Sequence, residues 1–207
     1  RLDELAQLPT LADANLDTAQ AVLNECAKFT QAVVAPLNHS ADKAPSYLKD
    51  GQVHTSAGFP EAYKKFVAGG WQGLQHPVDF GGQDLPKTIG AQCIEMLTSA
   101  SLSFSLAPIL TNGAIESMLT AGSDTLKALL LEKLVTGQWA GTMNLTESQA
   151  GSDLAQIRSR AEPTTDGQYK IFGTKIFITY GDQDLTENIV HLVLARVSGA
   201  PEGVKGI

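Results

Sequence analysis

The stretch that decides the fold opens with Trp139-Ala-Gly-Thr-Met-Asn-Leu-Thr-Glu-Ser-Gln-Ala-Gly-Ser-Asp153 and closes with Gly173-Thr-Lys-Ile-Phe-Ile-Thr179. Helical periodicity dominates the chain before this stretch, whereas short β-type runs joined by loops of small residues dominate from Gln138 onward. We therefore place an all-α helical domain at residues 1–137 and the beginning of a β domain at residues 138–207. The sequence predicts an α+β fold.

The first part of the chain carries the pattern of amphipathic helices. Apolar residues recur at three-to-four spacing after Asp17, which is expected to cap the first long helix, and Pro36 is expected to end it. Pro60 suits the first turn of another helix, which Gly69-Gly70 terminates, and Ser123 caps the last one. The expected helices cover residues 2–8, 17–36, 60–68, about 87–102, 108–121 and 123–137.

Turn signals and β-type runs make up the rest of the chain. Residues 38–58 read as a surface loop in which Asp50-Gly51 predicts a small hairpin, and Asp166-Gly167 predicts a second one. The expected strands cover residues 142–145, 157–161, 169–172, 175–179 and 189–197. The chain starts at Arg1 and stops directly after a strand-like run, so we interpret it as cut inside a sheet domain.

The composition is typical of a globular protein and argues against two kinds of partner. Of the 207 residues, 43% are hydrophobic and 18% are charged, which are ordinary values for a soluble domain. The net charge of −7 argues against a nucleic-acid partner held by bulk electrostatics. Apolar runs all fall short of the roughly 20 residues that cross a bilayer, so no membrane partner is expected.

The potential metal-ligating residues do not form a metal-binding pattern. Cys26 and Cys93 both fall on apolar stripes of expected helices, which favours two buried free thiols in a reducing compartment such as the cytoplasm and leaves a disulfide open. The four histidines are scattered, without a helical pair or a neighbouring cysteine. The sequence therefore predicts no metal site.

The loop between residues 145 and 153 is the candidate for chemistry. Gly151 lets the backbone come close to a ligand, and the hydroxyls of Thr146 and Ser152 can hold an anion or the polar edge of a ring. Gly/Ser loops after strands are common, so from these residues alone a purely structural loop is the favoured interpretation.

Three spaced motifs carry a resemblance to a known family. The segment from Met143 to Asp153 resembles the signature of the acyl-CoA dehydrogenase family, which usually has Thr-Glu-Pro before Ala-Gly-Ser-Asp. The segment from Gly173 to Thr179 resembles the family's second signature, Gly-x-Lys-x-(Trp/Phe)-Ile-Thr. The Gly- and Pro-rich segment at residues 70–86 is similar to the connector of the family's helical domain.

The chain also departs from the family pattern. Ser148 replaces the usual Pro, which is expected to loosen the loop, and Phe177 replaces the more frequent Trp. The segment at residues 180–188 is longer and more acidic than the usual Asn-Gly turn. This insertion resembles the longer members of the family, the subfamily that includes 3-methylmercaptopropionyl-CoA dehydrogenase.

The resemblance implies a fold and a cofactor. The family has an N-terminal helical domain, an antiparallel β-barrel-like middle domain and a C-terminal helical domain, and this chain would lack the last. FAD would lie between the last two domains, partly on a second subunit, in a homodimer or homotetramer. The implied cofactor-contacting positions are Met143, Leu145, Thr146, Gly151, Ser152, Phe177 and Thr179.

The implied roles differ from position to position. The Leu145 backbone and the Thr146 hydroxyl would contact the flavin ring, and Phe177 would pack on it. The Thr179 hydroxyl would approach flavin N5, where polar atoms stabilise the negative charge gained on reduction. Ser152 would lie beside the FAD pyrophosphate and the thioester end of the acyl-CoA substrate.

The implied reaction is α,β-dehydrogenation of an acyl-CoA to a 2-enoyl-CoA. A carboxylate base removes the α-proton and the β-hydride passes to flavin N5, with electron-transferring flavoprotein as the later acceptor. The base is expected in the missing C-terminal domain, so no catalytic residue is assigned and Glu147 is expected to be a structural acceptor. This fragment alone is expected to be inactive and to bind no FAD tightly.

Two alternatives to a dehydrogenase stay open. One is a non-catalytic or DNA-associated flavoprotein of the same fold. The other is a helical interaction domain with a β scaffold, which Thr146, Ser152 and Thr179 together disfavour.

Overall fold

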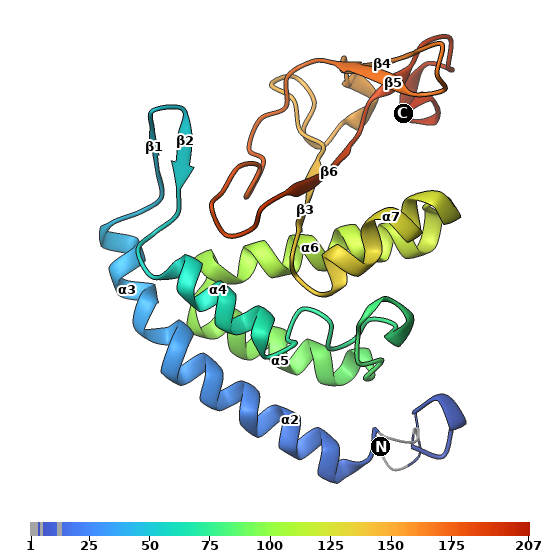
Figure 1. The fold of residues 1–207 in the computed structure, drawn as a ribbon. Helices are drawn as coiled ribbons and strands as arrows, with labels where there is room; N and C mark the ends of the chain where they lie inside the picture. Colours follow the sequence, from blue (N-terminus) through green and yellow to red (C-terminus); the bar gives the residue numbers. More distant parts are fainter. Residues whose placement is uncertain (1–3, 5, 12–13) are drawn as a thin grey trace.

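The computed structural model describes residue 4, residues 6–11 and residues 14–207 (Figure 1). Residues 2, 3 and 5 of the helical turn expected over residues 2–8 lie outside the described part of the chain. The helices form one body and the strands lie above it, with β3 and β6 nearest to the helices (Figure 1). The predicted α+β class, with the helical part first, is confirmed.

The helical part contains α2 (Leu16–Phe29), η2 (Thr30–Val34), α3 (Ala35–Lys43), α4 (Phe59–Ala68), α5 (Lys87–Ala100), α6 (Leu102–Ala121) and α7 (Asp124–Val135), with short 3-10 turns η1 (Pro9–Leu11) and η3 (Val78–Phe80). A hairpin of β1 (Tyr47–Lys49) and β2 (Gln52–His54) is inserted between α3 and α4. The β part contains β3 (Ala140–Asn144), η4 (Leu154–Gln156), β4 (Arg160–Pro163), β5 (Tyr169–Phe172), β6 (Ile189–Val193), β7 (Arg196–Val197) and η5 (Gly203–Gly206).

The first long helix differs from its predicted bounds at both ends. Its cap is Asn15 and not Asp17, because the Asn15 side chain accepts the hydrogen bond of the Thr18 N–H at 2.9 Å. Pro36 does not end it. The helix passes through the π-helical segment η2, and Pro36 then occupies the first turn of α3, where its missing N–H costs little.

A second correction concerns the helix that was expected to start at Pro108. It starts at Leu102 instead, because the Ser101 hydroxyl accepts the Phe104 N–H and caps it. Pro108 therefore lies inside α6. The other helix signals are confirmed: Pro60 lies in the first turn of α4, and Ser123 caps α7.

The two predicted hairpins are present. Asp50 and Gly51 both have positive φ, 51° and 78°, as a two-residue turn of type I′ requires, and they join β1 to β2. Gly167, with φ 79°, turns the chain between the antiparallel strands β4 and β5.

The β part is a set of short ladders and not a closed barrel within the described residues. β4 and β5 are antiparallel as expected, whereas β3 pairs with β6, and β4 with β7, in parallel. The strand expected over residues 189–197 is divided between these two ladders. The strand expected over residues 175–179 does not form, because Phe177 has a φ of 58°, which extended backbone does not allow.

The two parts meet where β3 crosses α6. Gly141 makes this contact possible, because a Cβ there would lie 2.4 Å from the Ala114 Cβ. The Gly141 N–H donates to the buried Thr111 Oγ1 at 3.1 Å. Trp139 packs on the cluster formed by α6 and α7.

The core of the helical part consists of three apolar clusters. The largest gathers buried side chains of α3, α4, α5 and α6 around Phe59, Phe66 and Phe104. Cys26 and Cys93 belong to another cluster, where both are buried free thiols, as predicted. Trp71 of the connector packs against both clusters.

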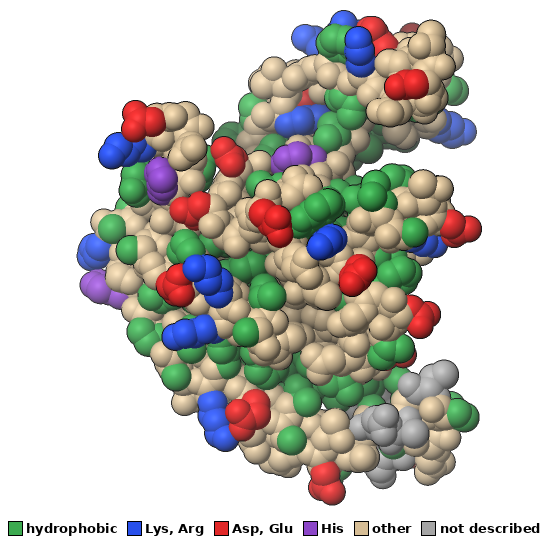
Figure 2. Space-filling model, in the orientation of Figure 1, with side chains coloured by type: hydrophobic (Ala, Val, Ile, Leu, Met, Phe, Trp, Pro, Cys, Tyr) green, Lys and Arg blue, Asp and Glu red, His purple; other side chains and the backbone are tan. Residues whose placement is uncertain are grey.

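The surface carries one apolar face of note. Leu126 and Leu129 of α7 are 43% and 63% exposed, and hydrophobic side chains gather over this helix (Figure 2). None of the described helices has both the length and the apolar character that a membrane span needs.

Candidate functional site

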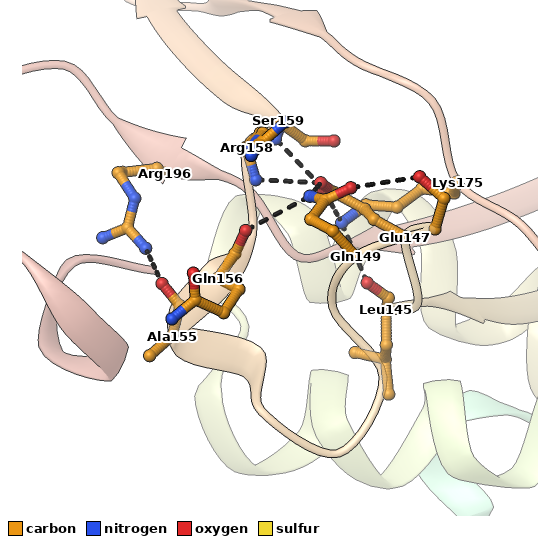
Figure 3. A network of polar contacts seen from close by, with 10 residues as sticks. Leu145, Glu147, Gln149, Ala155, Gln156, Arg158, Ser159, Lys175 and Arg196 are labelled. Carbon is orange, nitrogen blue, oxygen red and sulfur yellow. Dashed lines mark hydrogen bonds and ion pairs between the residues drawn. The ribbon is translucent and has the colours of Figure 1, made fainter.

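The two sequence motifs are joined by a buried ion pair. β3 leads into Glu147, whose carboxylate accepts a hydrogen bond from the Lys175 ammonium at 2.9 Å (Figure 3). The same ammonium donates to the Leu145 carbonyl oxygen at 3.0 Å. The Ile176 N–H donates to the Thr146 carbonyl oxygen at 2.9 Å. Leu145 and Thr146 are therefore held directly beside the segment that carries Phe177.

Glu147 is the central acceptor of this network, as predicted. Its side chain is 4% exposed and also accepts the backbone N–H groups of Arg158 at 2.8 Å and Ser159 at 3.0 Å. Burial by itself raises the pKa of the Glu147 carboxyl, but the hydrogen bonds from Ser159, Arg158 and Lys175 outweigh burial and hold the pKa well below its usual range. The N–H groups of Arg158 and Ser159 are therefore not available for pairing with a neighbouring strand. For this reason β4 begins at Arg160 and not at the predicted Ile157.

Side-chain contacts replace the rigidity that a proline at position 148 would give. The backbone closes on itself, since the Glu147 N–H donates to the Ala150 oxygen at 2.9 Å and the Ala150 N–H donates back at 3.1 Å. The Gln149 amide donates to the Glu147 carboxylate at 2.6 Å and to the Gln156 oxygen at 3.2 Å (Figure 3). The loop is therefore tied at both ends despite Ser148.

The outer part of the loop is open to solvent. Gly151 and Ser152 are exposed, and a Cβ added to Gly151 would meet no atom within 4 Å. Asp153 accepts the Ala155 N–H at 3.1 Å and so caps η4. Beside it, the Arg196 guanidinium donates to the Ala155 oxygen at 3.1 Å and to the Gly203 oxygen at 2.9 Å.

The second motif exposes the side chains predicted to meet a ring. Phe177 is 88% exposed and adopts the left-handed conformation, an unusual state for a large aromatic residue. Gly173 is required at the start of the motif, because its φ is 149° and a Cβ there would lie 2.2 Å from the Ser159 Oγ. Backbone strain at Phe177 together with its exposure is typical of a functional position.

Thr179 lies at the edge of a groove of about 650 Å³ between the helical and β parts. One side of the groove comes from α3, the end of β2 and the start of α6, with Phe59, Leu102 and Leu106 as its apolar lining. The other side is formed by Thr179 and the residues that follow it.

The predicted positions are thus brought together in part. Leu145 and Thr146 are tied to the Phe177 segment, and Met143 is half-buried on β3 opposite Leu192 of β6. Gly151 and Ser152 lie on the outer turn of the first loop, and Thr179 belongs to the groove. The placement of these residues against a flavin remains a prediction.

Two residues whose side chains hold the loops of this site together were not identified from the sequence. Lys175 stood in the second motif, and its charge, opposite to that of Glu147 in the first, was a usable signal for a pair. Arg196 gave no such signal, because its partners are backbone oxygens, which every residue carries.

The chain is similar to proteins of a flavoprotein class. Residues 17–138 match the acyl-CoA dehydrogenase N-terminal domain, so the chain belongs to the acyl-CoA dehydrogenase family. The chain is 51% identical over 204 residues to a 3-methylmercaptopropionyl-CoA dehydrogenase of Ruegeria pomeroyi, covering 99% of this chain and 35% of that protein. The chain spans about a third of the length of the curated relatives it matches.

Solved structures share the fold. The FAD-complexed acyl-CoA dehydrogenase of Bacillus anthracis is 21% identical with a TM-score of 0.70, over 90% of this chain and 30% of that one. The FAD complex of PigA is 26% identical with a TM-score of 0.63, over 79% of this chain and 41% of that one.

Proposed function

We propose that this chain forms the helical domain and the first flavin-contacting edge of an FAD-dependent acyl-CoA dehydrogenase. The proposed reaction is α,β-dehydrogenation of an acyl-CoA thioester to a 2-enoyl-CoA. We also propose the division into a helical domain at residues 1–137 and a middle domain at residues 138–207, since α7 ends at Val135 and β3 begins at Ala140.

One observation carries the proposal most strongly. The buried Glu147–Lys175 pair fixes the strand end at Leu145 and Thr146 against the segment that presents Phe177 to solvent. A buried, multiply hydrogen-bonded pair of this kind fixes one arrangement of two loops. The result is a rigid edge with an exposed aromatic ring, such as a planar cofactor requires.

The residues of this edge fit a flavin. Phe177 offers an exposed ring face, and the free space outside Gly151 leaves the loop backbone accessible. The Leu145 backbone, Thr146 and Thr179 would hold the ring, with Met143 beside it, while Gly151 and Ser152 would meet the pyrophosphate and the thioester. When bound, FAD supplies the two-electron acceptor of the dehydrogenation.

This chain's own residues would bind and orient the substrate. The groove beside Thr179 has an apolar lining of Phe59, Leu102 and Leu106, so the part of an acyl chain that lies against these side chains is removed from water. No residue of this chain is proposed as the base, because Glu147 is occupied by its four donors.

The proposed oligomeric state, compartment and electron acceptor are those that the resemblance to the family implies. We expect a homodimer or homotetramer in the cytoplasm, with electron-transferring flavoprotein as the acceptor. The 207-residue chain by itself is expected to be inactive and to retain no FAD through purification.

Anaerobic spectroscopy tests the proposal. The FAD-loaded protein with its middle and C-terminal domains complete is titrated with short acyl-CoA thioesters while the flavin absorbance is followed. Bleaching within one equivalent supports a dehydrogenase. A yellow protein that no acyl-CoA bleaches contradicts it and favours the non-catalytic or DNA-associated alternative.

A further inference from the structure

The segment at residues 180–188 fastens the β part to the helical part. The Tyr180 hydroxyl donates to the Ser103 oxygen at 2.7 Å, and burial together with the charge of Asp184 raises the pKa of Tyr180 to about 12. Asp184 accepts the Thr55 N–H at 3.1 Å and the Thr55 hydroxyl at 2.5 Å. The Leu185 side chain packs against the core of the helical part. The segment is therefore held in one position.

This fixed segment places a carboxylate on the groove. Asp182 lines it from the segment, and Asp42 lines it from α3. None of the described residues that line the groove is basic, and the other polar ones are hydroxyls or an amide. The groove thus carries two negative charges that no lining residue balances.

We propose that Asp42 and Asp182 make the groove select acyl groups with an uncharged end and reject those that end in a carboxylate. The inference rests on the proposed function, which places the acyl chain in this groove. A chain whose reacting carbons lie beside Thr179 extends along the groove toward these residues. A terminal carboxylate would meet like charges there, whereas a methyl or other neutral end would not.

The size of the effect follows from the partial exposure of both residues. Asp42 and Asp182 are exposed, so water weakens the repulsion relative to a buried site. We expect each carboxylate to contribute about a tenfold preference in kcat/KM, which corresponds to about 1.4 kcal/mol. The preference should shrink at high ionic strength, because screening acts on exposed charges.

The experiment compares two thioesters of equal carbon count in the FAD-loaded protein. Pentanoyl-CoA ends in a methyl group and glutaryl-CoA ends in a carboxylate. The measured quantity is the ratio of their kcat/KM values for the wild type, Asp42→Asn, Asp182→Asn and the double variant. Glu187→Gln is the matched control, because Glu187 carries the same charge on the same segment but does not line the groove.

The inference predicts that the wild type prefers pentanoyl-CoA and that each Asn variant lowers the ratio about tenfold. Glu187→Gln should leave the ratio unchanged. Equal rates with both thioesters, or a ratio that the Asn variants do not change, overturns the inference while leaving the dehydrogenase intact. If neither thioester bleaches the flavin, the proposed function fails and the inference fails with it.

Discussion

The Lys175→Met substitution tests the buried pair that holds the two motifs together. Lys175 and Glu147 have side chains that are 9% and 4% exposed, and their charged atoms lie 2.9 Å apart. Removing the ammonium leaves a buried carboxylate, and breaking a buried pair in this way costs about 3–5 kcal/mol. We expect a cost at the low end of this range, because Glu147 still accepts the hydrogen bonds of the Arg158 and Ser159 N–H groups.

A loss of about 3 kcal/mol corresponds to a fall in Tm of roughly 6–12 °C for a protein of this size. Differential scanning calorimetry of the wild type and the variant measures it. The matched control is Lys64→Met, which breaks an ion pair with Glu61 at 2.7 Å whose side chains are 69% and 71% exposed. Its Tm should stay within about 1 °C of the wild type, because exposed pairs contribute little. If Lys175→Met lowers the Tm no more than Lys64→Met, the reasoning is refuted.

Four further predictions rest on other contacts. The pKa of Glu147 is lower in the folded state than its unfolded value of about 4.3, so its stabilisation is complete above that pH and is lost gradually as the pH falls from there toward the folded-state pKa. The difference in urea unfolding free energy between the wild type and Glu147→Gln should therefore shrink from pH 6 to pH 3.5, and an unchanged difference would argue against an ionised Glu147. Phe177→Gly should raise the Tm of the flavin-free protein, because it relieves a positive φ, yet weaken FAD binding about threefold to tenfold in a fluorescence titration. Stronger FAD binding by that variant would exclude the proposed ring contact. Thr111→Val should cost about 1–3 kcal/mol in urea unfolding by leaving the Gly141 N–H unpaired, whereas Thr111→Ser should cost less; equal costs would point to packing alone. Cys26 and Cys93 should resist Ellman's reagent in the folded protein and react fully in denaturant, since both are buried and the hydrogen bond that the Cys26 thiol donates to Cys93, together with burial, raises the pKa of Cys26. Fast reaction of the folded protein would contradict this burial.

Local signals predicted most of the helical half and both hairpins. Ser123, Pro60 and Asp50-Gly51 act through bonds to near neighbours, so the sequence shows both partners at once. The prediction that Pro36 ends the first long helix was wrong, because it too rested on a local rule. The usual effect of a proline is to end a helix, and the π-helical segment that accommodates it has no local signature.

The β half was harder to predict because long-range contacts decide its backbone. Residues 175–179 have the β-branched and aromatic composition of a strand, but Lys175 turns inward to Glu147 and Phe177 leaves the extended region. The loop at position 148 was also predicted wrongly from local sequence. The absence of proline predicted a loose loop, but the hydrogen bonds of the Gln149 side chain hold the loop in place. The motifs identified the candidate site, and only the structure revealed what holds it together.

The structure of the FAD complex tests the central claim most directly. The quantity to measure is the distance from the isoalloxazine ring to the Leu145 backbone and to the hydroxyls of Thr146 and Thr179. We expect hydrogen-bonding distances of about 3 Å for these contacts, with Phe177 packed on the ring. A flavin bound elsewhere, with Thr146 and Thr179 facing solvent and Phe177 still exposed, would contradict it.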